Sequence, residues 1–360
     1  MNTFGKTHTT DITAKNTRLL KGIAVILLMW LHLFGVNFSG DWISPLKGFD
    51  IMSAVSASIC RAVFLFCSGY GLFRSYISKK AVSKSYILKK AAGTFIPYWI
   101  VMIISIVCLA ILGKFDPQYL MGNIFCWILD DNLYVSFAWY IKLYLLLIIV
   151  LPLIRLIEQK WKKNLCLDLL LYIVLPFVIY YAFRNHMDEA NFKNVIHSIV
   201  SSLLLLMYWF PLFGVGLVFS KYEFYSYIKK ISEKIPKWLL LTILFLTCGY
   251  VLFLRYRFRF DNITDVVYMP LFIISILLIV DITKFRSKYV LPFLGDKSLL
   301  YWLLNSMFFL NTVELQPLAY WPRIPILILI WTVILLTPFV YCCDWLSNKL
   351  LNLIFRNKKG

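Results

Sequence analysis

Residues 21–35 read KGIAVILLMWLHLFG, a lysine followed by an almost wholly apolar run that contains one histidine. A helix that crosses a lipid bilayer needs about 20 consecutive apolar residues, and this run has the character of such a helix. A cation or an imidazole is costly there and normally faces a protein interior or a water-filled cavity. The stretch therefore predicts a membrane-embedded fold and marks Lys21 and His32 as candidate functional residues.

The rest of the chain has the same character. Of its 360 residues 61% are hydrophobic, and the mean hydropathy is +0.75. This apolar share is far above that of a soluble domain. Because helices satisfy their own backbone hydrogen bonds in lipid, we expect an all-α polytopic membrane protein. The eight cysteines lie mostly in apolar runs without metal-ligand spacing, so we expect free thiols and no metal site.

About ten transmembrane helices are expected from the apolar stretches between polar breaks. They lie near 18–38, 54–78, 92–112, 137–157, 166–182, 197–219, 238–255, 264–281, 298–313 and 324–346. An even number of crossings places both termini on the same side of the membrane. We expect one integral-membrane domain over residues 1–360, with a helical core at 10–346 and a basic cytoplasmic tail at 347–360.

The net charge of +19 is distributed unevenly along the chain. Most lysines and arginines lie in alternate connecting segments and near the two termini, as the positive-inside rule predicts for cytoplasmic loops. Both termini are therefore expected in the cytoplasm, membrane lipids are expected partners, and nucleic acid is not. One stretch departs from the rule, because RYRFRFDNITD at 255–265 puts three arginines outside. Either this local excess is tolerated, or it binds an anionic lipid or glycan.

Lys21 and His32 are eleven residues apart, about three helical turns, so their side chains should lie on one face of the first span. Their separation along the axis is roughly 16 Å, which suggests a polar path through most of the membrane. Lys21 alternatively extends to the lipid headgroups, and His32 alternatively bonds a neighbouring helix. As a chemical group, His32 is suited to accept a proton, because a free imidazole is mostly neutral at pH 7.

The second span carries Arg61 and Ser68, seven residues apart and therefore also on one face. Because this span runs inward, Arg61 should lie roughly 10 Å below the outer surface, at about the depth of His32. We expect Arg61 and His32 to meet in a cavity in the outer half of the membrane.

Together these residues resemble the acyltransferase-3 family of integral-membrane O-acyltransferases. The resemblance begins with Lys-x10-His on the first span and FLFCSGY at 64–70 on the second. Further segments follow in the family's order: IPYW at 96–99, WYIKLYLLLIIVLPLI at 139–154 and SLLYWLLN at 298–305. The resemblance implies about ten spans and transfer of an acyl group, usually acetyl, from cytoplasmic acyl-CoA to a hydroxyl of an extracytoplasmic or lipid-linked carbohydrate.

The resemblance also implies roles for individual residues. His32 would be essential for transfer, either as a base or as a nucleophile that carries the acyl group, with Arg61 beside it as a second catalytic candidate. The chemistry of the side chains, independently of the resemblance, adds further candidates: Lys21, Lys89 and Lys90 for the phosphates of acetyl-CoA, Arg61, Ser68 and Tyr70 for the oxyanion at its reactive end, and Trp139 and Tyr140 for stacking on a sugar. Packing is the alternative role for Ser68 and Tyr70, and interfacial anchoring is the alternative for Trp139 and Tyr140.

Two positions depart from the family pattern. An R-x-x-R motif at the start of the third span is replaced by Lys89 and Lys90, and a histidine that often follows in the ninth span is Asn305. The competing interpretation is a transporter or flippase for a polysaccharide precursor, which would have similar spans but show internal symmetry. A family member that has lost activity and acts as a sensor or structural partner is a third interpretation.

Overall fold

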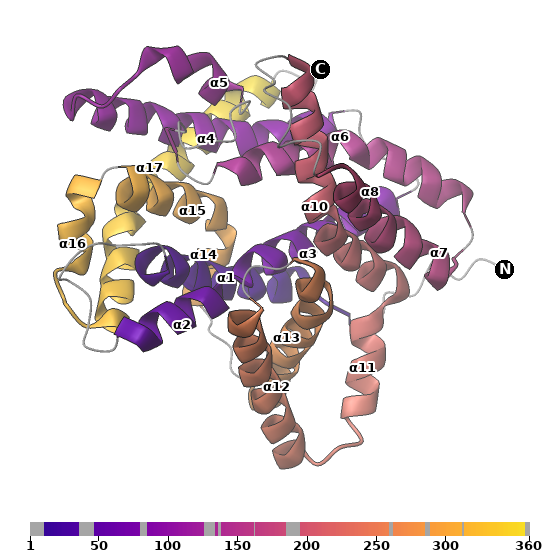
Figure 1. Ribbon diagram of the computed structural model, residues 1–360. Coiled ribbons are helices and arrows are strands. Elements are labelled where there is room, and N and C mark those ends of the chain that lie inside the picture. The colour runs from indigo at the N-terminus through magenta and orange to yellow at the C-terminus, as the bar shows by residue number, and fades with distance from the viewer. Residues whose placement is uncertain are drawn as a thin grey trace.

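The structure is a computed structural model in which every described element is helical (Figure 1). It describes residues 11–35, 47–79, 85–125, 134–135, 138–161, 163–184, 195–258, 262–284, 289–311 and 313–356.

The first half of the chain forms α1 (Ala14–Phe34), α2 (Lys47–Ala57), α3 (Cys60–Leu72), η1 (Phe73–Ile77), α4 (Tyr86–Ile111), η2 (Pro117–Tyr119), α5 (Leu120–Ile124), α6 (Trp139–Lys160), α7 (Leu165–Leu169), η3 (Leu170–Val174) and α8 (Leu175–Phe183). The second half forms α10 (Val195–Tyr222), α11 (Phe224–Ser232), α12 (Lys237–Arg257), α13 (Asn262–Thr283), α14 (Val290–Asp296), α15 (Ser298–Ser306), η4 (Met307–Asn311), η5 (Val313–Leu315), α16 (Gln316–Tyr320) and α17 (Pro325–Arg356).

Nine helices in the described part of the chain are long and apolar enough to cross a membrane. The tenth expected span, at 298–313, is the shorter apolar helix Ser298–Phe309. The expectation of an all-α polytopic membrane protein is thereby confirmed. The last helix, α17, continues ten residues beyond the expected span end at 346, to Arg356. The orientation of the termini and the division into core and tail stay predictions.

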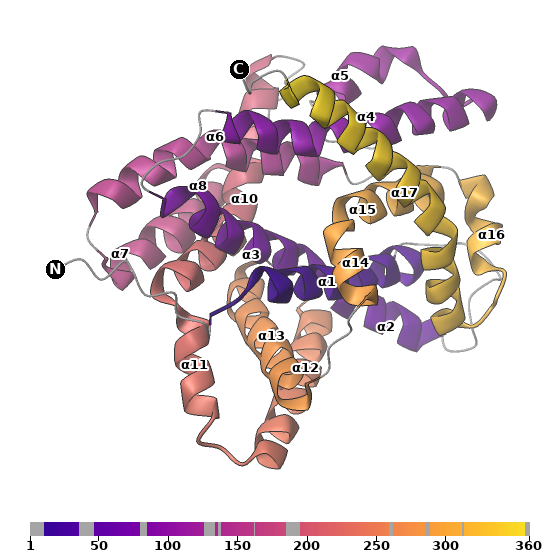
Figure 2. The same cartoon turned by 180° about the vertical axis from the view of Figure 1, so that it is seen from behind.

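The helices divide into a buried centre and a lipid-facing periphery. Within their most apolar windows, α3 and α10 are mostly buried, whereas most of α12 and α17 is exposed. Both views show α1 and α3 in the middle of the molecule, with α12 and α13 projecting together as a pair at the bottom (Figures 1 and 2). Residues that face other helices near α1 are therefore shielded from lipid, which is where costly polar side chains can be placed.

Local signals in the sequence define both ends of α1. The Thr13 side chain accepts a hydrogen bond from the backbone N–H of Asn16, at 3.2 Å, which caps the first turn. Gly35 follows the last helical residue, and its N–H donates to the Leu31 carbonyl at 2.8 Å. Lys21 and His32 therefore both lie within one continuous helix whose two ends are fixed by these hydrogen bonds.

Glycines allow α1 to pack against α14 at backbone distance. A Cβ atom on Gly22 would lie 2.0 Å from the Leu291 carbonyl oxygen, and a Cβ atom on Gly295 would lie 1.9 Å from the Arg18 carbonyl oxygen. Helices in lipid associate through such small residues, because apolar side chains gain nothing by leaving lipid for another apolar surface. This contact holds the beginning of α15 beside the N-terminal half of α1.

Two sets of ion pairs are buried between helices. Lys221 of α10 lies 2.8 Å from Glu158 of α6 and 2.7 Å from Asp168 of α7, and so joins three helices. At another place Arg255 of α12 pairs with Asp265 of α13 at 3.0 Å, and both side chains are buried. Arg255 is one of the three arginines of the 255–265 stretch. Because its side chain is buried and paired, it does not contribute an exposed positive charge to that stretch. Residues 259–261 of that stretch lie outside the described residues.

Candidate active site

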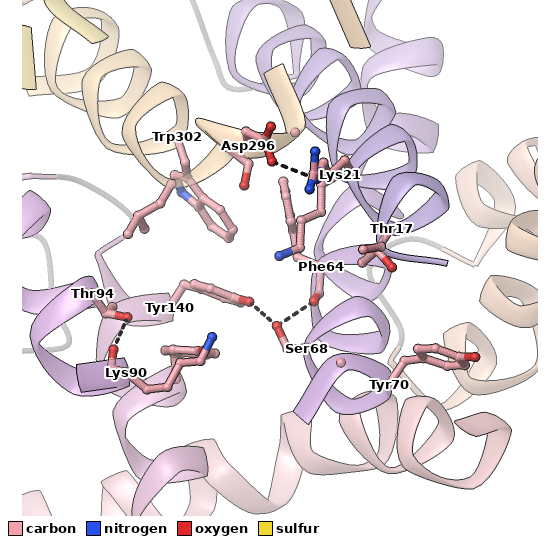
Figure 3. Close-up of a pocket in the computed structure, with 18 of the residues that line it drawn as sticks. Thr17, Lys21, Phe64, Ser68, Tyr70, Lys90, Thr94, Tyr140, Asp296 and Trp302 are labelled. Carbon is pink, nitrogen blue, oxygen red and sulfur yellow. Dashed lines mark hydrogen bonds and ion pairs between the residues drawn. The ribbon is translucent and has the colours of Figure 1, made fainter. Parts of the chain in front are cut away.

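A cavity with a volume of about 730 Å³ lies beside the N-terminal half of α1. Its walls come from α1, α3, η1, α4, α6, α14 and α15 (Figure 3). The volume falls within the range of small-molecule and cofactor sites in proteins.

Lys21 and Lys90 extend into the cavity, from α1 and α4 respectively (Figure 3). Neither ammonium group forms an ion pair with another described residue. Asp296 is the acidic residue among the described residues that line the cavity, and it is paired with Arg18 at 3.3 Å. Two like charges without counter-charges favour an anion between them.

Arg18 and Arg74 add two further cations to the cavity wall. Arg74 forms an ion pair with Asp11, and Asp11 also accepts a 2.5 Å hydrogen bond from the hydroxyl of Tyr70. The predicted residue Tyr70 therefore lines the cavity but directs its hydroxyl away, toward the N-terminal segment (Figure 3). The sequence reasoning missed both arginines, although Arg18 precedes Lys21 by almost one helical turn and should share its face.

Lys89 and Lys90 were both predicted to bind the phosphates of acetyl-CoA, but their side chains point in different directions. Lys89 does not line the cavity; its ammonium lies 5.6 Å from the ring centroid of Phe355 on α17. Lys90 lies 5.8 Å from the ring centroid of Tyr86 and faces the cavity. Adjacent residues on a helix point about 100° apart, and here this turn directs Lys90 to the cavity and Lys89 to α17.

Three aromatic rings close the other end of the cavity: Phe64 of α3, Tyr140 of α6 and Trp302 of α15. The ring centroids are 5.3 Å apart for Phe64 and Trp302, and 4.6 Å apart for Tyr140 and Trp302. The predicted residue Ser68 lies on the cavity side of these rings. Its hydroxyl donates to the Phe64 carbonyl at 2.9 Å and lies 3.3 Å from the Tyr140 hydroxyl (Figure 3).

His32 lies beyond these rings and does not line the cavity. It is buried, and its Nδ1 atom is 2.7 Å from the amide nitrogen of Asn305 on α15. Asn305 follows Trp302 by three residues, which corresponds to about 4.5 Å along the helix. Lys21 contributes to the cavity wall beside α15 and His32 contacts α15 further along, so both face one side of α1, as their spacing predicts.

Arg61 also lies beyond the rings, three residues before Phe64 on α3. Its charge is close enough to act on His32, and its guanidinium lies 5.1 Å from the ring centroid of Trp209. Trp209 in turn stacks on Trp139, with centroids 4.7 Å apart. The two predicted catalytic residues are thus near each other, with His32 buried and Arg61 half-buried. The open outer-half cavity that we expected around them stays a prediction.

Comparison with known proteins gives one match. A family model described as an acyltransferase domain matches residues 16–347. The chain belongs to the acyltransferase-3 family. No curated protein and no solved structure matches it at a significant level.

This acyltransferase is therefore a multi-pass membrane enzyme, and the family match spans almost every residue of the cavity wall and of the histidine region. Within the described residues no group of three or more histidine, cysteine and acidic side chains is placed to hold a metal ion. On the cavity wall the acyltransferase presents the polar side chains of Lys21, Lys90 and Ser68, and beyond the three rings it places His32 beside Asn305.

Proposed function

We propose that this acyltransferase takes a short acyl group, normally acetyl, from cytoplasmic acyl-CoA and transfers it to a hydroxyl of an extracytoplasmic or lipid-linked carbohydrate. The observation that carries the proposal is the arrangement along α1. A cation-lined cavity adjoins Lys21, and a buried histidine lies roughly 16 Å further along the same helix.

The charge of the cavity supports acyl-CoA as the donor. Acyl-CoA carries several phosphate charges at one end and an uncharged thioester at the other. Lys21, Lys90 and Arg18 lie at the charged end of the cavity, where ammonium and guanidinium groups bind phosphate. By the positive-inside rule this end faces the cytoplasm, where acyl-CoA is found. The slender pantetheine arm would then extend toward Phe64 and Trp302.

The buried histidine supports acid–base chemistry at the thioester. In the proposed reaction the oxygen of the acceptor hydroxyl attacks the thioester carbonyl carbon, and His32 accepts the proton of that hydroxyl. The carbon–sulfur bond then breaks, and the proton passes to the departing thiolate. A positioned base contributes about 10²- to 10⁴-fold to such a reaction. Asn305 would hold the imidazole in one orientation, as the orienting group of a catalytic pair does.

The guanidinium of Arg61 is placed to stabilise a negative charge that develops near His32. During attack the carbonyl oxygen becomes negative, and a nearby cation in a water-poor region stabilises that charge strongly. We therefore assign Arg61 to oxyanion stabilisation. Because Tyr140 borders the cavity and Trp139 packs on Trp209, their positions support a role at the reactive end of the donor more than a sugar-stacking role.

Acyl transfer can be measured directly with purified protein in lipid nanodiscs. The protein is incubated with radiolabelled acetyl-CoA, with and without chitotriose as a soluble hydroxyl acceptor, and both labelled sugar and released thiol are measured. We expect His32→Ala to lower thiol release by at least about 100-fold, the contribution of a positioned base. His186→Ala, which changes a histidine that the sequence places in a loop, is the matched control.

The outcomes separate the possible mechanisms. Transfer that is equally fast in His32→Ala would remove His32 from the chemistry and contradict the proposal. Label that remains on the protein without acceptor, and disappears in His32→Ala, would show that the imidazole carries the acyl group as a covalent intermediate. Release of thiol only when acceptor is present would support direct attack by the hydroxyl.

A further inference from the structure

The boundary between the cavity and His32 is formed by aromatic side chains from three separate helices. Phe64, Tyr140 and Trp302, here called the aromatic triad, all line the cavity. They are 4%, 9% and 4% exposed, respectively. The three centroid separations are 4.6, 5.3 and 6.4 Å, all in the range of direct aromatic contact. The three rings are therefore in direct contact with one another at the cavity wall.

Two helices show that the triad stands between the cavity and the reacting groups. On α3 the order is Ser68 on the cavity wall, Phe64 in the triad and Arg61 beyond it. On α15 the order is Leu299 on the cavity wall, Trp302 in the triad and Asn305 beside His32. Each step from the triad to the residue beyond it is about 4.5 Å of helix rise.

On the side of the triad that faces His32, the neighbouring apolar side chains are buried, whereas the other side faces the cavity. Met29 and Leu33 of α1, Leu304 of α15 and Met307 of η4 are fully buried around the level of His32. Behind the triad Trp139 contacts Trp302 at 6.2 Å and stacks on Trp209 at 4.7 Å between centroids. A large acyl group has no room here unless an indole moves, and protein cores resist added volume.

We propose that the aromatic triad determines the length of the acyl group that this enzyme accepts, with Trp302 as the main limiting residue. This inference rests on the proposed function. The thioester must come within bonding distance of the acceptor near His32, so the acyl group has to fit among these three rings. An acetyl group adds only two carbons there, whereas an octanoyl group adds eight and collides with the indole.

Binding of unreactive donor analogues tests this proposal without an acceptor. The probes are CoA, S-ethyl-CoA and S-octyl-CoA, whose thioether bonds cannot transfer an acyl group. Their dissociation constants are measured by isothermal titration calorimetry on protein in nanodiscs. In the wild-type enzyme we expect S-octyl-CoA to bind at least about tenfold more weakly than S-ethyl-CoA, the penalty of overfilling a packed site. In Trp302→Ala the two analogues should bind within about threefold of each other, because the space of the indole is free.

Matched variants exclude general effects of removing a large ring. Trp345→Ala removes an exposed indole from α17 and should keep the wild-type preference. Phe64→Ala tests the triad independently if Trp302→Ala does not fold, and should also relax the preference. Tyr140→Phe keeps the ring, removes only the hydroxyl beside Ser68, and should select against S-octyl-CoA as the wild type does.

The possible failures are distinguishable. If CoA binds but the ratio between the two analogues is the same in wild type, Trp302→Ala and Phe64→Ala, the triad does not select acyl length and the inference is overturned. The same holds if the wild type binds both analogues equally. If neither CoA nor either analogue binds to the wild type, the proposed donor itself is wrong, and this inference falls with it.

Discussion

Asn305 of α15 lies 2.7 Å from Nδ1 of His32 on α1, although the two residues are 273 positions apart in the sequence. Both side chains are buried, and the amide oxygen of Asn305 has no hydrogen-bond partner among the described residues. Hydrogen bonding therefore does not fix which end of the amide faces the ring. If the oxygen faces Nδ1, the ring donates from Nδ1 and carries its acceptor lone pair on Nε2.

Substitutions at Asn305 distinguish these arrangements. We expect Asn305→Leu to lower kcat by about 10- to 100-fold with little change in the donor KM, because a buried hydrogen bond to the base is lost. Asn305→Asp presents only acceptor atoms to Nδ1 and should keep kcat within about tenfold of wild type. Steady-state kinetics with acetyl-CoA measure both values. Asn348→Leu, on the exposed face of α17, is the control. Equal losses in the Asp and Leu variants would contradict an orienting role.

Lys21 and Lys90 should contribute to donor binding, whereas Lys89 should not. Removing either cavity lysine deletes a charge-assisted contact to phosphate, and we expect the KM for acetyl-CoA to rise about 10- to 100-fold in Lys21→Ala. Lys89→Ala is a close control, because this neighbour of Lys90 faces Phe355 instead. The wild-type KM should also rise with salt, since screening weakens these contacts. A Lys89→Ala effect as large as that of Lys90→Ala would mean that phosphate lies elsewhere.

The close packing of α1 against α14 should not tolerate a methyl group. In Gly295→Ala the new Cβ atom would lie 1.9 Å from the Arg18 carbonyl oxygen, and backbone cannot move aside cheaply. We expect destabilisation of at least about 1–3 kcal/mol. Thermal unfolding in detergent, followed by intrinsic fluorescence, measures the change. Gly249→Ala has nothing within 4 Å of its Cβ position and should be neutral or slightly stabilising. Similar midpoints for the two variants would show that α14 can shift away.

The buried Lys221 should stabilise the fold through its two carboxylate partners. Lys221→Met would leave Glu158 and Asp168 buried without their counter-charge, at a cost of about 3–5 kcal/mol. Lys229→Met is the matched control, because Lys229 pairs with Asp281 at 2.5 Å in a partly exposed position. Partly exposed pairs contribute about 1 kcal/mol or less. The thermal unfolding midpoints of the two variants are compared. If Lys229→Met is as unstable as Lys221→Met, the buried ion pairs do not stabilise the fold more than the partly exposed one.

Features that depend on one segment at a time were predictable from the sequence. The apolar runs predicted every span to within a few residues at most ends, because span length is set by the thickness of the bilayer. The spacing of Lys21 and His32 predicted their common face, because helix geometry is local. The family was suggested by motifs such as FLFCSGY, whose order and spacing are properties of the linear chain.

The proximity of Arg61 and His32 was expected, but most other features that depend on which helices meet were not predictable. Trp302 and Phe64 looked like ordinary apolar residues, and Lys89 looked equivalent to Lys90. The reason is that lipid and protein interior are equally apolar, so hydropathy does not say which face of a span meets another helix. Contacts at single glycines, such as Gly22 and Gly295, decide that instead.

The sequence by itself determined that the chain crosses the membrane repeatedly and carries a lysine and a histidine on one face of its first helix. Only the tertiary structure decided that Asn305 meets His32 and that Phe64, Tyr140 and Trp302 close the cavity before it. Helical periodicity fixes positions along one segment, whereas the partners of each face are fixed by the packing of segments that lie hundreds of residues apart.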